Sequence, residues 1–181
     1  MTDLDCVPLG DAMVMRGGTV DPAKHSDELF DLYSIPAYDR ESPDQVLGAE
    51  IGSSKQIVQP GDVLLSRIVP HIRRAWIVGA NNGRRLIASG EWIVFRSDKH
   101  DSRWLRHVLL SDRFHREFMA TVAGVGGSLL RARPAQVALI GVQLPPLDEQ
   151  RRIAAILDQA EAIRASRDQS VKLLDELSRA I

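Results

Sequence analysis

The side chains best suited to chemistry in this sequence are basic, and they gather in its middle. Residues 51–147 carry fourteen Lys and Arg against six Asp and Glu, whereas residues 1–50 carry three basic residues against eleven acidic ones. A clustered positive charge suits a surface that binds a polyanion, because phosphate contacts supply most of the affinity for nucleic acid. The two segments could instead fold against each other and neutralise locally, and charge alone leaves both alternatives open.

Basic groups and hydroxyls beside turns are the candidates for such contacts. Both bind phosphates, and Arg is the commonest reader of guanine. The glycines of "GVGGSLLRARP" would also let the backbone approach a phosphate closely. If the surface binds nucleic acid, the candidates for these contacts are Ser54, Lys55, Arg67, His71, Arg73, Arg74, Ser89, Ser128, Arg131 and Arg133. Each of them alone could be an ordinary surface residue, so the prediction concerns the cluster.

A catalytic constellation is not evident. The sequence lacks a G-x-x-x-x-G-K-[ST] phosphate loop, a dinucleotide-binding fingerprint and an H-E-x-x-H zinc motif. Asp62, Glu91 and Lys99 could be combined into a nuclease site, but a Pro-Gly-Asp turn already explains Asp62. The lone Cys6 forbids an internal disulfide and is expected to be small and at least half-buried. We predict no catalytic residue, no metal site and no cofactor.

Two further expectations concern the remaining residues. The tryptophans Trp76, Trp92 and Trp104 are expected in the core, and Arg84 and Arg85 are expected to be exposed at the tip of a hairpin. The sequence shows neither a membrane-length apolar run nor a signal-peptide pattern at its start. We therefore expect a cytoplasmic protein without a membrane partner.

Short strands followed by helices must position these groups. Residues 6–15 and 31–38 are expected to be extended, and five β-type runs follow between residues 55 and 97. Their near-continuous apolar character predicts burial on both faces. Residues 101–122 have helical spacing and predict one helix, or two with a bend near Ser111. Residues 136–146 are expected to form a last strand.

The C-terminal segment predicts a long helix that begins after two prolines, with Asp148 as its N-cap. Its apolar positions recur in steps of three and four, which is a heptad seam with a polar middle. At about 1.5 Å per residue the helix is roughly 50 Å long, more than the domain needs to cover its own core. We expect a partner on the seam, which consists of Ile153, Ile156, Ala160, Ile163, Arg167, Ser170, Leu174, Leu177 and Ile181.

The stretch "VQLPPLDEQRRIAAILDQAEAIRASRDQSVKLLDEL" resembles the segment that ends each target-recognition domain in the specificity (S) subunit of type I restriction-modification systems. The blocks "VPLGDAMVMRGGTVDP", "FDLYSIPAYD", "IGSSKQIVQPGDVLLSRIVPHIRRAWIV", "IASGEWIVFR" and "GVGGSLLRARP" are similar to the successive internal blocks of such a domain. The resemblance spans essentially the whole chain.

The resemblance implies a mixed α/β (α+β) fold, with a DNA-binding target-recognition domain over residues 1–147 and a spacer helix over 148–181. It implies a non-catalytic subunit that directs methyltransferase (M) subunits and, indirectly, a restriction (R) subunit to a bipartite target on double-stranded DNA. S-adenosylmethionine and ATP are then expected on those partners only. A full S subunit has two such domains and two such helices. This chain is therefore expected to be either a half-subunit that pairs with a second copy or a different half through its helix, or a fragment of a two-domain chain, and the sequence leaves both alternatives open.

An alternative is an S-like interaction module that dimerises, or competes for a methyltransferase subunit, without reading DNA productively. Both readings require the helix seam, and only the first requires the basic loops.

Overall fold

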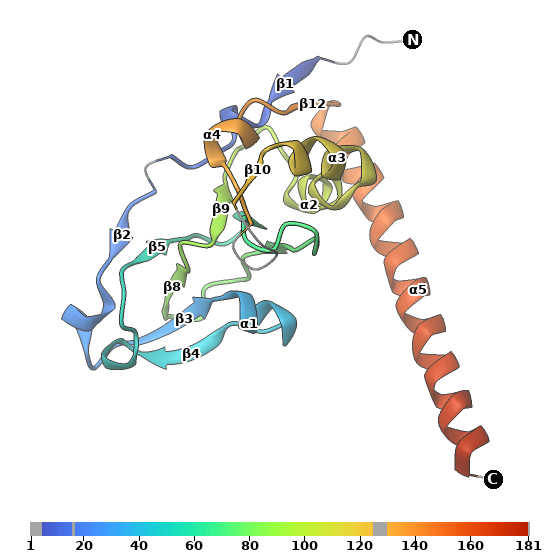
Figure 1. Ribbon diagram of the computed structural model, residues 1–181, viewed down its shortest axis with the longest axis horizontal. Helices are drawn as coiled ribbons and strands as arrows, with labels where there is room; N and C mark the ends of the chain where they lie inside the picture. Colours follow the sequence, from blue (N-terminus) through green and yellow to red (C-terminus); the bar gives the residue numbers. More distant parts are fainter. Residues whose placement is uncertain (1–4, 16, 125–129, 181) are drawn as a thin grey trace.

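Short strands form the body of the molecule, and one long helix leaves it (Figure 1). The computed structural model describes residues 5–15, 17–124 and 130–180. The strands are β1 (Cys6–Pro8), β2 (Thr19–Val20), β3 (Leu29–Tyr33), β4 (Asp44–Leu47), β5 (Lys55–Ile57), β6 (Val63–Ser66), β7 (Ala75–Ile77), β8 (Arg85–Ala88), β9 (Trp92–Phe95), β10 (Val122–Ala123), β11 (Arg131–Ala132) and β12 (Gly141–Gln143). The α-helices are α1 (Ile35–Asp39), α2 (Ser102–Leu110), α3 (Asp112–Ala120), α4 (Pro134–Val137) and α5 (Leu147–Ala180). This mixed α/β architecture confirms the predicted fold class.

Two sheets make up the centre of the body. The larger has the order β2-β5-β8-β3-β4, in which only β3 and β8 run parallel, and the smaller has the antiparallel order β7-β6-β9. Neighbouring residues of a strand point to opposite faces. Leu64 of β6 accordingly packs with Leu86 of the larger sheet, while Val63 and Leu65 contact the cluster that contains α2 and α3. The smaller sheet is therefore buried on both faces, as its apolar runs predicted.

One serine separates α2 from α3. The Ser111 hydroxyl donates to the Val108 carbonyl at 2.7 Å, at the end of α2, and accepts from the Phe114 amide at 3.2 Å, at the start of α3. Of the two alternatives for residues 101–122, two helices with a bend at Ser111 is thus the correct one. Trp92 and Trp104 are buried as expected, and Trp76 is half-buried against the rings of Tyr33 and Tyr38.

Several local predictions were wrong. The extended segment expected over 6–15 is a strand only at Cys6–Pro8, and Leu9–Asp11 form a 3-10 helix. The extended segment expected over 31–38 ends at Tyr33, because Ser34 caps helix α1 and Pro36 fits its first turn. The strand expected over 136–146 is only β12, because residues 134–137 form α4. Cys6 is exposed on the edge pair β1–β12, where it lies beside Gly141.

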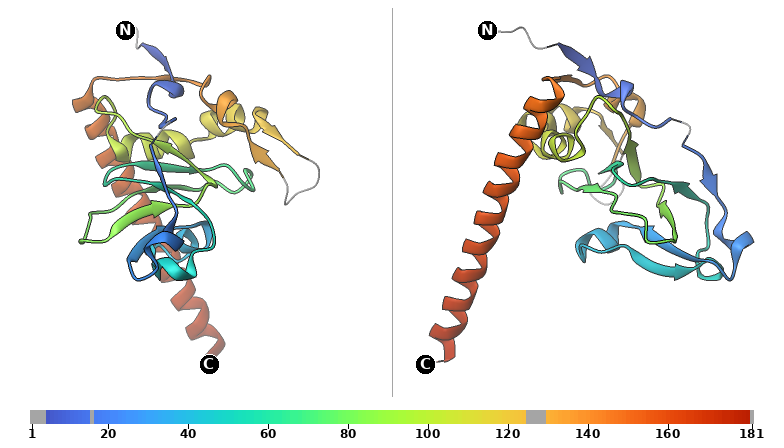
Figure 2. Two further views of the ribbon diagram at one scale, coloured as in Figure 1. Left: turned by 90° about the vertical axis from the view of Figure 1, so that its left-hand side faces the viewer. Right: turned by 180° about the vertical axis from the view of Figure 1, so that it is seen from behind.

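Helix α5 begins at Leu147, one residue before the predicted N-cap Asp148, and its first hydrogen bond joins the Gln150 amide to the Pro146 carbonyl. Only its start lies against the body, and the rest extends away from it (Figures 1 and 2). The prediction that residues 1–147 and 148–181 are separate functional units stays a prediction. None of the described helices is long and apolar enough to span a membrane.

Candidate nucleic-acid interface

Backbone hydrogen bonds bring three of the predicted contact segments together. The Arg67 amide donates to the Glu91 carbonyl at 2.9 Å, and the Arg67 carbonyl accepts from the Ala132 amide at 2.8 Å. Ile68 and Arg131 also form an isolated antiparallel bridge. These contacts bring together three segments, namely the end of β6, the turn before β9 and the hairpin β10–β11. The hairpin projects from the body in Figure 2 (left). Of the arginines on these segments, Arg131 is exposed and Arg67 is half-buried.

The loop between β6 and β7 presents the next basic groups. Val69 has a positive φ of 45°, a conformation that is an outlier for a β-branched residue and costs about 1–3 kcal/mol. The Ile72 amide closes the turn on the Val69 carbonyl at 2.9 Å, and exposed His71 lies between them. Strain of this kind persists where the surrounding structure imposes it, often at a binding loop.

Arg73 anchors this loop to the start of α3. Its guanidinium donates to the Leu110 carbonyl at 3.1 Å and pairs with the Asp112 carboxylate at 2.6 Å. The hydrogen bond from Arg73 lowers the pKa of Asp112. Burial, and then the charge of Arg73, lower the pKa of His115. Arg73 is thus held close to His115 at the start of α3.

Arg74 forms an ion pair with another residue of the chain. Its guanidinium binds both carboxylate oxygens of Asp39, at 3.0 and 3.3 Å, and its side chain is only 11% exposed. Arg84 and Arg85, expected as exposed hairpin charges, instead pair with Asp31 and Glu28 at 2.7 and 3.0 Å. The acidic first segment therefore neutralises part of the basic middle. Local neutralisation therefore holds for Arg74, Arg84 and Arg85, and a polyanion-binding role for the other basic residues stays a prediction.

Lys55 and Ser89 serve local structure. The Lys55 ammonium donates to the carbonyl and hydroxyl of Ser53 at 2.8 and 2.7 Å, and burial lowers its pKa. The Ser89 hydroxyl accepts from the Glu91 amide at 3.4 Å in the β8–β9 turn. Ser54 is exposed next to Lys55. The Ser54–Lys55 turn and Ser89 are linked through Gln56, whose amide donates to the Ser89 carbonyl at 2.9 Å.

The glycine-rich loop is described only in part. Ser128 lies outside the described residues, while Arg133 is exposed and precedes α4. The sequence did not single out His115 and exposed Arg116, which lie near Asp112 together with Arg73. Their spacing could have identified them in the sequence, because residues three and four positions after Asp112 lie on the same helix face as Asp112.

Asp62, which we considered above as part of a nuclease site with Glu91 and Lys99, has a structural role. The buried Asp62 carboxylate binds Arg96 through two 2.7 Å hydrogen bonds and accepts from the Gln59 amide at 2.8 Å. These partners use both of its oxygens. Asp62 therefore supports the turn before β6.

A cluster of charged groups joins α2 to α5. His107 contacts the Asp158 carboxylate at 2.7 Å, Arg103 pairs with the same carboxylate at 3.2 Å, and Arg106 pairs with Glu161 at 2.9 Å. His107, Asp158 and Glu161 have ligand atoms within 4.8 Å of one another. Because two guanidinium groups already neutralise the carboxylates, we interpret the cluster as a junction between helices.

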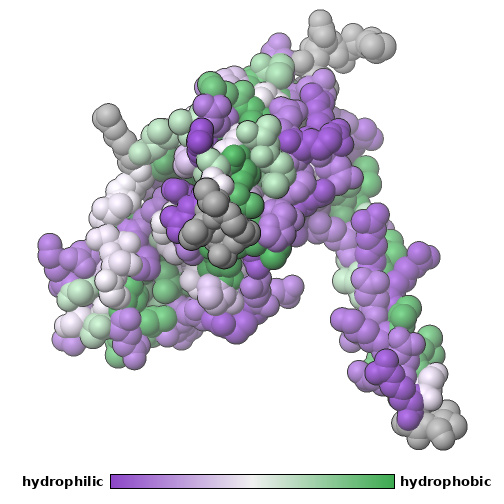
Figure 3. All heavy atoms as spheres, viewed as in Figure 1, coloured by the Kyte–Doolittle hydropathy of each residue, from purple (hydrophilic) through white to green (hydrophobic). Residues whose placement is uncertain are grey.

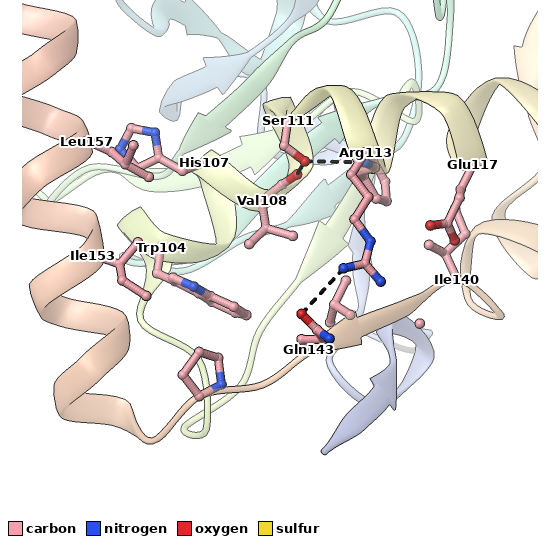
Figure 4. Close-up of a pocket in the computed structure, with 14 residues that line it drawn as sticks. Trp104, His107, Val108, Ser111, Arg113, Glu117, Ile140, Gln143, Ile153 and Leu157 are labelled. Atoms are coloured by element: carbon pink, nitrogen blue, oxygen red, sulfur yellow. Dashed lines mark hydrogen bonds between the residues drawn. The ribbon is translucent and has the colours of Figure 1, made fainter. Parts of the chain in front are cut away.

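An apolar cleft lies beside this junction (Figure 4). It has a volume of about 340 Å³ and runs between α2, α3, β12 and the start of α5. Trp104 and Val108 line it from the body, and Ile153 and Leu157 line it from α5. Ile153 packs against the core of the body, so the exposed part of the predicted seam begins at Ile156.

The described seam residues after Ile153 are exposed to solvent. Ile156, Ile163 and Leu174 are 58%, 51% and 63% exposed, and hydrophobic residues are visible along the free part of α5 in Figure 3. Ala160, Arg167 and Ser170 are also exposed. The side chain of Leu177 and all of Ile181 lie outside the described residues.

A domain with a strained basic loop and a projecting hairpin, joined to a long helix with an open seam, fits a DNA specificity domain. The sequence model of the type I restriction modification DNA specificity domain matches residues 3–173, and the chain belongs to that family. This confirms the resemblance found in the sequence. No curated protein matches the chain.

Solved structures show the same fold. One is the crystal structure of the HsdS subunit from Thermoanaerobacter tengcongensis, which is 25% identical, with a TM-score of 0.77 over 92% of this chain and 44% of that one. A second belongs to a structure described as the structural basis of complex assembly and conformational transition of the type I R-M system, with 24% identity and a TM-score of 0.76 over 94% of this chain and 46% of that one. The chain thus spans less than half the length of both.

Proposed function

We propose that this chain is a DNA-sequence-recognition subunit, or half of one, that directs the other subunits of a type I restriction-modification system to a bipartite DNA target. The observation that carries the proposal is the convergence of the backbone segments that carry Arg67, Arg131 and the strained loop at Val69 in a specificity-family chain. Basic groups on phosphates would supply affinity there, and those that reach base edges would supply discrimination.

The ion pair of Arg73 suits such a role. Asp112 is 80% exposed, and an exposed pair contributes little net stability in water. A DNA phosphate can therefore take the place of Asp112 at low cost. His115 and Arg116 would lie beside that phosphate, because they surround Asp112.

The chemical steps belong to other subunits in this proposal. Methyltransferase subunits would bind S-adenosylmethionine and turn the target adenine out of the stack, and a restriction subunit would use ATP. The chain itself binds no cofactor and contributes position alone. Its place of action is the cytoplasm.

A second recognition half completes the target. The exposed seam of α5 would bind the corresponding helix of a second copy or of a different half. If the two copies are identical, two-fold symmetry gives an interrupted palindrome as the target.

The test of the proposal is modified-base sequencing of DNA from cells that express the neighbouring methyltransferase subunit, with and without this chain. We expect methyladenine in a two-part motif only when the chain is present. If the proteins co-purify but no motif appears, the chain does not direct methylation and the proposal fails.

Single substitutions test the surface. We expect Arg67→Ala and Arg131→Ala to weaken DNA binding, and each lost phosphate contact to reduce the slope of log K against log[salt] by about 0.9. Lys172→Ala, on the free part of α5, is the control and should leave both quantities unchanged. Arg73→Glu is a further informative variant, whereas Arg74→Glu would place a carboxylate against Asp39 and report on folding.

A further inference from the structure

Arg67 and Glu91 continue the ladder between β6 and β9 by one residue pair. The last pair of these antiparallel strands is Ser66 opposite Trp92, so Arg67 follows opposite Glu91. The hydrogen bond from the Arg67 amide to the Glu91 carbonyl, at 2.9 Å, agrees with this pairing. Directly opposite residues of an antiparallel pair project from the same face, with Cβ atoms about 4.5–5.5 Å apart. The side chains of Arg67 and Glu91 therefore leave the sheet on the same face.

These two charges do not neutralise each other in the structure. Both residues are half-buried, and within the described part of the chain no ion pair or hydrogen bond engages the Arg67 guanidinium or the Glu91 carboxylate. Other charges of the basic middle are paired, such as Arg96 with Asp62. Taking a charge out of water is costly unless a partner replaces the water. An adjacent cation and anion that are half-buried and unpaired are therefore suited to a ligand that presents both acceptors and a donor.

The negative charge of Glu91 restricts what this ligand can be. A carboxylate repels phosphate, so Glu91 cannot make the sequence-independent contacts that basic groups make with the DNA backbone. In the major groove a carboxylate can accept a hydrogen bond only from an exocyclic amino group, which cytosine presents at N4 and adenine at N6. Adenine also presents the acceptor N7 beside its amino group, whereas cytosine presents the donor alone. Cytosine is therefore the better partner for Glu91.

Arg67 is complementary to the other base of the same pair. Guanine presents the two acceptors O6 and N7, which a guanidinium binds in bidentate fashion. We propose that Arg67 and Glu91 together read one G·C base pair in the major groove, with Arg67 on guanine and Glu91 on N4 of cytosine. The reversed C·G pair would set the guanidinium against the amino group and the carboxylate against two acceptors. The inference rests on the proposed function, since it assigns a base contact to a chain that recognises DNA.

The test combines modified-base sequencing with binding of the complex between the chain and the neighbouring methyltransferase subunit to duplexes that vary one base pair of the motif. We expect the wild-type motif to contain a G·C pair for which Glu91→Ala and Arg67→Ala both lose preference, by about tenfold to a hundredfold. Glu91→Gln keeps the shape of the side chain and should admit A·T at the same position, because glutamine pairs with adenine. Glu176→Ala, which removes a carboxylate from the exposed part of α5, is the control.

Binding to unrelated DNA separates a base contact from a phosphate contact. Glu91→Ala should bind unrelated duplexes as tightly as the wild type or more tightly, since it removes a repulsive charge, whereas loss of a phosphate contact weakens binding to all sequences alike. Circular dichroism shows that the compared variants are folded. If Glu91→Gln and Arg67→Ala keep the wild-type motif, or relax it at different positions, the inference is overturned and the proposed function still stands. A wild-type chain that directs no motif overturns the proposed function and the base contact with it.

Discussion

One buried amide fixes the start of α5. The Gln150 side chain donates to the carbonyls of Lys99 and Pro145 at 3.0 and 2.8 Å and accepts from the Asp101 amide at 2.8 Å. The sequence motif contained this residue without indicating its role. Since the side chain is only 1% exposed, no water is available to replace a lost bond.

We expect Gln150→Leu to lower the free energy of unfolding by about 2–4 kcal/mol, because it leaves buried backbone groups unpaired. The melting temperature should fall by roughly 5–10 °C, as measured by circular dichroism. Gln169→Leu makes the same change on the exposed part of α5 and should have little effect. Equal effects of the two variants would show that the Gln150 bonds are unimportant.

His100 links stability to pH. It is buried against Trp104, with ring centroids 5.8 Å apart, and neither ring nitrogen has a hydrogen-bond partner among the described residues. Burial lowers the pKa of His100 below its usual 6.5. In the folded state the group therefore binds its proton less readily than in the unfolded state.

The consequence has a definite sign. The unfolded chain takes up more protons below about pH 6.5, so the contribution of His100 is fully present above that pH and is lost as the pH falls toward the lower folded pKa. We expect urea unfolding to show a weaker pH dependence in this range for His100→Phe than for the wild type. His25→Phe, at an exposed position, is the control. An unchanged pH dependence in His100→Phe would contradict the assignment.

At the scale of elements, the orientation of α5 depends on charged contacts with α2. Arg103, Arg106 and His107 belong to the helix predicted over 101–122, and Asp158 and Glu161 belong to the long helix. Each helix could be predicted from its own periodicity. Their contact could not, because all five residues are also ordinary charges of a solvent-exposed helix face.

We expect Asp158→Asn with Glu161→Gln to reduce stability by about 1–2 kcal/mol, since the pairs are partly exposed and His107 is nearly buried. The loss should be greater at low salt than at high salt. Urea unfolding at both salt concentrations measures it. Asp168→Asn with Glu176→Gln removes the same charges farther along α5 and should not change the midpoint.

At the scale of the whole molecule, the body lies against one side of the start of α5, and the side chains that the structure describes beyond Glu161 are exposed (Figure 2). In the proposed function the helix acts as a spacer, whose length and phase place the domain relative to a partner. Length changes by 1.5 Å per residue and phase by about 100°, so the two can be varied separately.

Insertions between Glu161 and Ala162 separate these effects. Seven inserted residues turn the domain by only about 20° relative to the seam, and we expect a bipartite methylation motif with a longer spacer. Five inserted residues turn it by about 140°, and we expect the chain to associate but to give no bipartite motif. Modified-base sequencing and sedimentation measure the two outcomes. An unchanged spacer after the seven-residue insertion would exclude α5 as the spacer.

The sequence by itself determined the family, the mixed fold, the buried strands and the long helix, and it left open whether residues 101–122 form one helix or two. These follow from local periodicity and from motifs that neighbouring residues carry together. Tertiary structure decided which charges are available. Arg74, Arg84 and Arg85 resemble Arg67 and Arg131 in the sequence, but acidic residues thirty-five to fifty-seven positions away bind the first three. Such partners are set by how the strands are ordered in the sheets, and no local pattern records that order.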